Sequence, residues 1–243
     1  MRRWRRRGRA PHTLEGLINF RDLGGLPTTG GGAVRPGRLF RSDSLAYATQ
    51  ADVTHLVDDL RVATVIDLRG EFEVTHLGRG AFASAPVSYV SAPIADVSGA
   101  EDLVGHYVAM LTEKGDVLAG TVRLLSSTSA LPAVFHCEAG CDRTGVLAAV
   151  VLSLLGVPDE AIAADYAATA TAMPRIHERV SEVVDRLGLP PRPASVLDWT
   201  PQAAMMLRML ELAKDRWGSI QDWAHTYGLK DDDLSALRAA LVA

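Results

Sequence analysis

Apolar residues fall along the chain in runs of two kinds, and these predict two kinds of element. Short runs rich in Val, Ile and Phe, bounded by Pro, Gly or polar residues, are typical of buried strands. Runs in which apolar residues recur every three or four positions indicate helices. On this basis we predict strands within residues 17–26, 39–41, 62–68, 86–94 and 131–135.

The predicted helices lie between and after these strands. Thr49 is expected to cap a helix over residues 51–60, and the longest apolar run, residues 146–155, predicts a buried helix. Further helices are predicted over residues 98–113, 117–125, 158–170, 175–187, 200–217, 219–227 and 231–241. Strands that alternate with helices predict an α/β fold with a central, mostly parallel sheet flanked by helices, and a helical C-terminal part.

The most distinctive stretch separates the last predicted strand from the buried helix: residues 136–145, His-Cys-Glu-Ala-Gly-Cys-Asp-Arg-Thr-Gly. A strand, a tight loop and a helix direct backbone N–H groups and a helix N-terminus at one point, which attracts an anion. Cys137 is expected to be a thiolate there, because the N–H groups and Arg143 favour its charged form. The planar guanidinium of Arg143 can hold two phosphate oxygens.

A buried structural cysteine in an ordinary turn is the alternative explanation of this stretch. His136 before the cysteine, Gly140 where the loop must turn and Thr144 after the arginine favour a functional loop. Ligands of parallel sheets bind beyond the carboxyl ends of the strands, which places Cys137 and Asp67 on the same rim.

Residues 136–145 resemble the signature loop of cysteine-dependent phosphatases, His-Cys, five residues, then Arg-Ser or Arg-Thr. They are most similar to the bacterial tyrosine-protein phosphatase family, which includes enzymes that pathogens secrete and whose loop usually has the sequence His-Cys-x-Ala-Gly-Lys-Asp-Arg-Thr-Gly. The resemblance covers most of residues 15–242 and implies a phosphotyrosine-phosphatase-like fold. Other matching segments are residues 19–25, 35–42, 65–69, 164–166 and 227–228.

The resemblance also implies roles for the loop residues. Cys137 would attack phosphorus in line and form a phosphocysteine intermediate that water hydrolyses. The Thr144 hydroxyl would stabilise the sulfur as a leaving group, and His136 would orient the loop through hydrogen bonds. The phosphate-binding residues would be Glu138, Ala139, Gly140, Cys141, Asp142, Arg143 and Thr144, largely through their backbone N–H groups.

Three aspartates compete for the role of general acid, which protonates the leaving oxygen. Asp142 ranks first, because the matching aspartate is the favoured acid of the family. Asp96 lies 41 residues before Cys137, where related phosphatases carry an acid on a mobile loop. Asp67 ends a predicted strand, and an ion pair with Arg69 or an N-terminal arginine explains it better than catalysis.

Cys141 stands where the family usually has Lys, whose charge would suit acidic phosphoinositide head groups. The sequence therefore predicts a protein-tyrosine phosphatase, of tyrosine or dual specificity, that acts on a phosphotyrosine-containing protein or a small phosphomonoester. Three alternatives remain open. They are a phosphoinositide phosphatase, a non-catalytic module that binds a phosphorylated protein, and a sulfur transferase.

Cys137 and Cys141 are the only two cysteines of the chain. They provide no disulfide framework and indicate a reducing compartment, so we expect the protein in the cytoplasm, with secretion without a signal peptide left open. A bridge between them under oxidation would protect the nucleophile from irreversible sulfinic acid. The alternative is that Cys141 only fills the loop.

Residues 1–12 form a tail with six Arg among its first nine residues, and we predict that it is disordered and precedes a single domain, residues 13–243. A tail that binds nucleic acid or anionic lipid is the alternative. The net charge is −4 despite this tail, which argues against a nucleic-acid substrate. No apolar run approaches the roughly 20 residues of a membrane helix, so no stable membrane association is expected. The seven His show no ligand spacing, and we expect neither a metal nor a cofactor.

Overall fold

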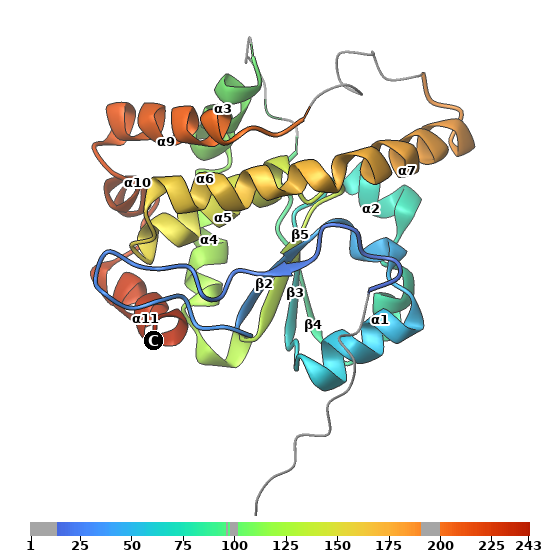
Figure 1. The fold of residues 1–243 in the computed structure, drawn as a ribbon, viewed down its shortest axis with the longest axis horizontal. Helices are drawn as coiled ribbons and strands as arrows, with labels where there is room; N and C mark the ends of the chain where they lie inside the picture. The colour runs from blue at the N-terminus through green and yellow to red at the C-terminus, as the bar shows by residue number, and fades with distance from the viewer. Residues whose placement is uncertain (1–13, 96, 98–101, 191–199) are drawn as a thin grey trace, which may run out of the picture.

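One five-stranded sheet organises the computed structural model, which describes residues 14–95, 97, 102–190 and 200–243. The strand order is β1-β2-β5-β3-β4, and all neighbours are parallel except β1 and β2. The predicted α/β fold with a mostly parallel sheet is confirmed (Figure 1). The strands are β1 (Arg21–Asp22), β2 (Leu39–Ser42), β3 (Thr64–Asp67), β4 (Ser88–Ser91) and β5 (Ala133–His136).

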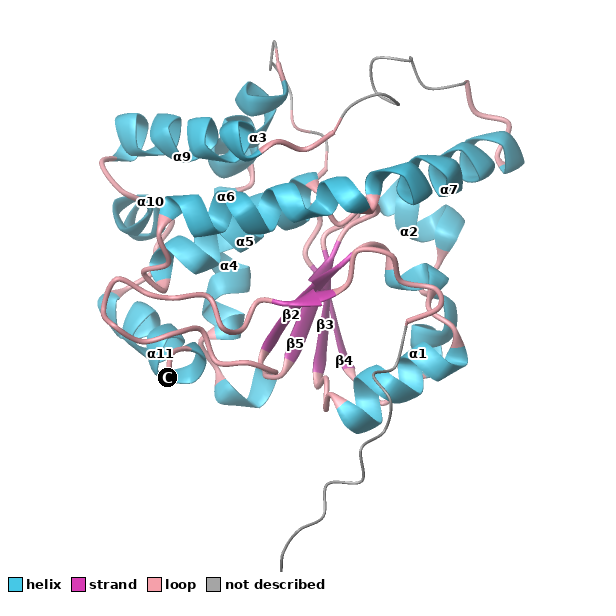
Figure 2. Cartoon of the chain, in the orientation of Figure 1, coloured by secondary structure: helices cyan, strands magenta, loops and turns pink. Residues whose placement is uncertain are grey.

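Helices cover both faces of the sheet (Figure 2). The larger layer contains α4, α5, α6 and the C-terminal helices, and α1 lies on the opposite face. The helices are α1 (Gln50–Thr54), α2 (Glu71–Leu77), α3 (Leu103–Glu113), α4 (Gly115–Leu125), α5 (Asp142–Leu154), α6 (Asp159–Ala168), α7 (Met173–Arg186), α9 (Ala203–Trp217), α10 (Ile220–Thr226) and α11 (Asp231–Leu241). None of these described helices is both long and apolar enough to cross a membrane.

The alternation of side chains along the central strands divides the core in two. Ile66 of β3 and Phe135 of β5 belong to the large cluster on the α5 side. Their neighbours Val65 and Val134 belong to a smaller cluster beside α1. Strands buried on both faces are apolar throughout, which explains why β3 and β5 could be predicted from continuous apolar runs.

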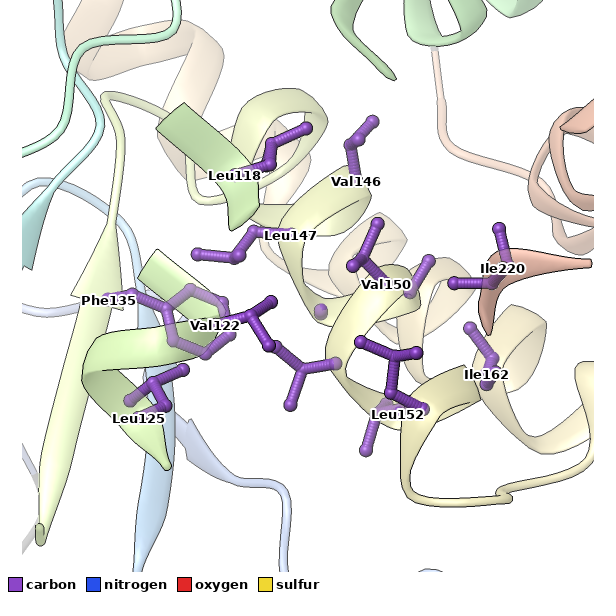
Figure 3. Close-up of a cluster of buried hydrophobic side chains, with 14 of the residues drawn as sticks. Leu118, Val122, Leu125, Phe135, Val146, Leu147, Val150, Leu152, Ile162 and Ile220 are labelled. Atoms are coloured by element: carbon purple, nitrogen blue, oxygen red, sulfur yellow. The ribbon is translucent and has the colours of Figure 1, made fainter. Parts of the chain in front are cut away.

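Helix α5 is the centre of the larger layer. Its residues 144–152 are all buried, so it is apolar on every side. Figure 3 shows Val146 and Val150 of this helix among side chains from other elements, including Phe135 and Ile162. Each such side chain contributes about 1.5–3 kcal/mol by leaving water. This burial fixes the position of the helix, and therefore of the residues in its first turn.

The structure differs from the prediction at several boundaries. Helix α5 begins at Asp142, four residues before the predicted start, because its first turn is polar. The strand predicted within residues 17–26 is limited to Arg21–Asp22, and α2 was not predicted. Thr49 caps α1 as expected, and α3 begins after Asp102, whose side chain accepts the Gly105 N–H.

Some predictions concern residues that the structure does not describe. The arginine-rich tail and the general-acid candidate Asp96 lie outside the described residues, as does the start of the helix predicted over residues 98–113.

Candidate active site

The loop between β5 and α5 consists of residues 137–141, and its backbone carbonyl groups are held from outside. The Glu138 carbonyl accepts the Ser44 N–H, and the Ala139 carbonyl accepts the side-chain amide of Asn19. The Gly140 carbonyl accepts both from Asn19 and from the Arg41 guanidinium, and the Cys141 carbonyl accepts the Gly145 N–H. All of these hydrogen bonds are 2.7–3.1 Å long. None of the loop N–H groups from Glu138 to Cys141 donates to another described residue. The loop therefore forms a cradle of free N–H groups at the N-terminus of α5, which favours an anion.

A buried ion network supports this cradle from behind. Arg41, fully buried on β2, binds Asp165 at 2.5 Å and the Gly140 carbonyl at 2.8 Å. Arg21 binds the other carboxylate oxygen of Asp165 at 2.7 Å. Burial alone would raise the pKa of Asp165, but Arg41 and Arg21 outweigh it and lower that pKa. Loss of one member would leave an uncompensated buried charge, which typically costs 3–5 kcal/mol.

Gly140 turns the loop at a position where no side chain fits. Its φ is +68°, in the left-handed region that favours glycine. A Cβ built on it would lie 2.4 Å from the carbonyl oxygen of Ser42 and 2.6 Å from the Asp43 nitrogen. The requirement for glycine, predicted from the turn, therefore also reflects the close approach of the end of β2.

Arg143 lies in the first turn of α5 and binds Glu73 of α2. Its two terminal nitrogens donate to the two carboxylate oxygens, with Nη2 at 2.7 Å from Oε1. Burial alone would lower the pKa of Arg143, but the Cys137 sulfur and Glu73 raise it. A guanidinium has five N–H donors, so the Nε–H and one N–H on each terminal nitrogen remain for a phosphate. Glu73 also accepts the Gly70 N–H at 2.9 Å, which fixes it at the start of α2.

Asp142 is held by a pair of buried tyrosines. Tyr107 of α3 donates its hydroxyl to Asp142 Oδ1, and its oxygen lies 2.8 Å from that of Tyr166 on α6. Burial, and next the Asp142 carboxylate, raise the pKa of Tyr107, so its hydroxyl stays a donor. Asp142 and Arg143 line the same pocket, of about 380 Å³, with apolar walls that include Ile94 and Met110.

His136 and Asp67 lie beneath the cradle. Burial lowers the pKa of His136 to about 4, although the Asp67 carboxylate favours the charged ring. The neutral ring donates from Nδ1 to the Cys137 carbonyl at 3.1 Å. Asp67 is fully buried and accepts from Arg69 at 2.7 Å and from the Tyr89 hydroxyl at 2.9 Å. Asp67 therefore forms the ion pair with Arg69 that the sequence suggested, and its oxygens are committed to it.

The two cysteines and Thr144 complete the site. Cys137 and Cys141 are both buried free thiols. Burial raises the pKa of Cys141 well above its usual value, so this thiol stays protonated. Thr144 Oγ1 is buried and has no hydrogen-bond partner among the described residues, so the predicted bond to the Cys137 sulfur is not formed here.

The mostly parallel sheet, with a loop of free N–H groups at the carboxyl end of its central strand β5, places the protein in a class, the α/β proteins built like the cysteine-dependent phosphatases. The chain belongs to the tyrosine phosphatase family, whose model matches residues 12–243.

Known proteins resemble the chain at several levels. It is 30% identical over 233 residues (89% of this chain, 83% of the relative) to a Cupriavidus necator protein whose name assigns it provisionally to the tyrosine-protein phosphatases. It is 29% identical over 214 residues (73% and 75%) to the triple specificity protein phosphatase PtpB of Mycobacterium tuberculosis. The core catalytic domain of the PP-IP phosphatase SIW14 from S. cerevisiae matches with a TM-score of 0.43 and 13% identity, over 74% of this chain and 98% of that domain.

The structure brings together most, but not all, of the residues singled out from the sequence. Cys137, Asp142 and Arg143 lie in the loop after β5 or in the first turn of α5, beside the free loop N–H groups, whereas Asp67 is fully buried in its ion pair with Arg69. Sequence reasoning missed Glu73 and Tyr107. A signal for Glu73 existed, because Gly-x-x-Glu after a strand is a helix-start pattern in which Glu accepts the backbone N–H three residues earlier. No local signal pairs Tyr107 with a residue 35 positions away.

Proposed function

We propose that the protein is a protein-tyrosine phosphatase in which Cys137 is the nucleophile. The observation that carries this proposal is the cradle itself. A buried sulfur begins a loop whose carbonyls are all bound from outside, so that its N–H groups, with Arg143, can stabilise the charge that develops on the phosphoryl oxygens.

In the first step, the Cys137 thiolate attacks phosphorus in line and forms an S–P bond. The bond between phosphorus and the leaving oxygen breaks, and its electron pair moves to that oxygen. Asp142 donates the proton that neutralises the leaving group. Its position beside Arg143 in one pocket, and the Tyr107 bond that fixes its Oδ1, support this role over Asp67.

In the second step, water attacks the phosphocysteine and the S–P bond breaks, which restores the thiolate. Asp142, now a carboxylate, accepts a proton from the water. Thr144 is suited to stabilise the departing sulfur, because its buried hydroxyl has no other partner among the described residues. His136 is a positioning residue, since its ring is neutral, buried and bonded to the loop backbone.

The proposed substrate is a phosphotyrosine-containing protein or a small aryl phosphomonoester. The pocket beside Asp142 includes apolar side chains such as Ile94, Leu103 and Met110, against which an aromatic ring can pack. The relative PtpB carries the name triple specificity protein phosphatase, so phosphoserine and phosphothreonine belong in the test. Two free, buried thiols suit a reducing compartment and support a cytoplasmic location.

The test compares the wild-type protein with Cys137→Ser. We expect the wild type to hydrolyse p-nitrophenyl phosphate and phosphotyrosine peptides faster than phosphoinositides, and the variant to bind a phosphotyrosine peptide without hydrolysing it. A variant that keeps wild-type turnover would remove Cys137 from the mechanism. A wild type that binds but never hydrolyses would instead indicate a phosphoprotein-binding module.

A further inference from the structure

A second, smaller pocket adjoins the cradle on the side of α2 and α7. It has a volume of about 180 Å³, below the 300–1,000 Å³ typical of pockets for whole small molecules, so it has room for a single side chain. Its walls are mostly apolar, with Phe72 and Leu77 on one side and Val183 of α7 and Leu187, directly after that helix, on the other; His76 also lines it. We call it the Glu138 pocket, because the loop residue Glu138 lines it together with Glu73.

The carboxylates of Glu73 and Glu138 differ in their partners, because within the described part of the chain only Glu73 is bound by a cationic side chain. Glu73 is paired with Arg143 through both oxygens. Glu138 accepts a single hydrogen bond, from the Tyr47 hydroxyl to Oε1 at 2.6 Å, and its Oε2 is buried with no partner among the described residues. Burial raises the pKa of Glu138 and outweighs the opposite effects of the Tyr47 hydrogen bond and of the Arg69 and Arg143 charges. A buried carboxylate oxygen without a hydrogen-bond donor costs desolvation free energy, and a positive group beside it offsets that cost.

The walls limit which positive group fits. A long aliphatic stem can lie against the valine and leucine side chains while its charged end stays near the carboxylates, as lysine and arginine do. Phe72 is 54% exposed and contacts His76 with ring centroids 4.1 Å apart and planes tilted by 31°, so the exposed part of its ring can offer a π face to a guanidinium or ammonium. An acyl chain would leave Glu138 unpaired, and a second phosphate would be repelled by it.

We infer that the Glu138 pocket binds a lysine or arginine side chain close to the phosphorylated residue of a peptide substrate. The inference rests on the proposed function, because Glu138 directly follows the nucleophile in sequence. A substrate phosphate in the cradle therefore brings neighbouring peptide residues to this pocket, where the negative charge and apolar walls select a basic side chain.

The experiment uses phosphotyrosine peptides that carry lysine, arginine, norleucine or glutamate at each of the three positions on either side of the phosphotyrosine. Norleucine keeps the stem of lysine without its charge. At one or more positions we expect kcat/KM to be on the order of tenfold higher for the basic residue than for norleucine. Leu187→Lys places a competing cation at the pocket wall and should abolish this preference while p-nitrophenyl phosphate turnover is kept.

Matched variants separate the pocket from general charge effects. Glu138→Gln should reduce the preference, whereas Glu71→Gln removes an exposed carboxylate on α2 outside the pocket and should keep it. If Leu187→Lys does not fold, Val183→Trp fills the same pocket without a charge. Three outcomes would overturn the inference but leave the proposed function standing. They are equal rates for all peptides, a preference for norleucine, and a preference for the basic residue that survives both wall variants. If no phosphopeptide is hydrolysed, the proposed function fails and the inference with it.

Discussion

Glu73 binds Arg143 through both oxygens of its carboxylate, with Nη2 and Oε1 2.7 Å apart. The pair links the first turn of α2 to the first turn of α5, across 70 residues of sequence. Both side chains are only partly exposed, at 18% for Arg143 and 24% for Glu73, so solvent screens the pair incompletely. Its consequence is geometric, because it fixes which N–H donors of Arg143 remain for a phosphate.

We expect Glu73→Gln to lower kcat/KM for aryl phosphates on the order of tenfold to a hundredfold, because the guanidinium loses the partner that orients it. Steady-state kinetics with p-nitrophenyl phosphate measure this effect. Glu71→Gln, an exposed acid on the same helix, is the control and should match the wild type. Wild-type kinetics for Glu73→Gln would show that Arg143 is positioned by other contacts.

Asp142→Asn should slow turnover of phenyl phosphate by roughly 10²-fold or more, because the leaving oxygen then departs without a proton. Substrates with an acidic leaving group should suffer less, since their oxygen needs less assistance. Tyr107→Phe should reduce the rate by a smaller factor, because it removes only the hydroxyl that fixes Asp142. A rate loss in Asp142→Asn that is the same for good and poor leaving groups would argue against an acid role.

Acidification should destabilise the fold through His136. Its pKa is about 4 in the folded protein against the usual 6.5, so the unfolded chain binds the extra proton between these values and stability falls as the pH drops from 6.5 towards 4. Between pH 7 and pH 5 the loss is about 2 kcal/mol. Urea unfolding at both pH values, with His136→Asn beside the wild type, measures it.

The slope of stability with pH tests His136, whatever the absolute stability of the variant. His136→Asn should lose less stability on acidification than the wild type, because it removes the ring that takes up a proton only on unfolding. Equal slopes for His136→Asn and the wild type would mean that the ring is already charged, or is solvated, in the folded state.

Gly140→Ala should abolish activity and lower stability by a few kcal/mol, since the new methyl group would lie 2.4 Å from the Ser42 carbonyl oxygen at a positive φ. Gly120→Ala on α4 is the control, because a Cβ there meets nothing within 4 Å, and it should change stability by no more than about 1 kcal/mol. Activity and thermal unfolding of the two variants provide the comparison. Retained activity in Gly140→Ala would contradict the requirement for this turn.

The sequence predicted the elements that carry a strong apolar pattern. Strands β3 and β5 and the interior of α5 are buried on all sides, so their composition alone reveals them. Helix α2 was not predicted, because none of its residues is buried and it shows no continuous apolar face. The missed helix carries Glu73, so a functional contact was missed with it.

The site was predicted only as far as it is local. The order of residues 136–145 is enough to predict a cradle of N–H groups with Cys137 at its start and Arg143 at the N-terminus of α5, because these lie close together in sequence; the role of Cys137 as nucleophile stays a prediction. The groups that hold them, such as Asn19, Arg41 and Tyr107, come from distant segments. Their roles depend on tertiary packing, which residue spacing does not encode.

The external anchoring of the loop carbonyls has a consequence for inhibitor design. The carbonyls of Glu138, Ala139 and Gly140 are bound by residues from distant segments and that of Cys141 by the first turn of α5, so the cradle is a rigid template with little room for an unusual conformation that a drug could exploit. A charged phosphate mimic must therefore match the cradle as it stands. If the Glu138 pocket binds a basic side chain, neutral or basic substituents that extend from such a mimic onto the pocket walls beside α2, α3 and α7 should add affinity.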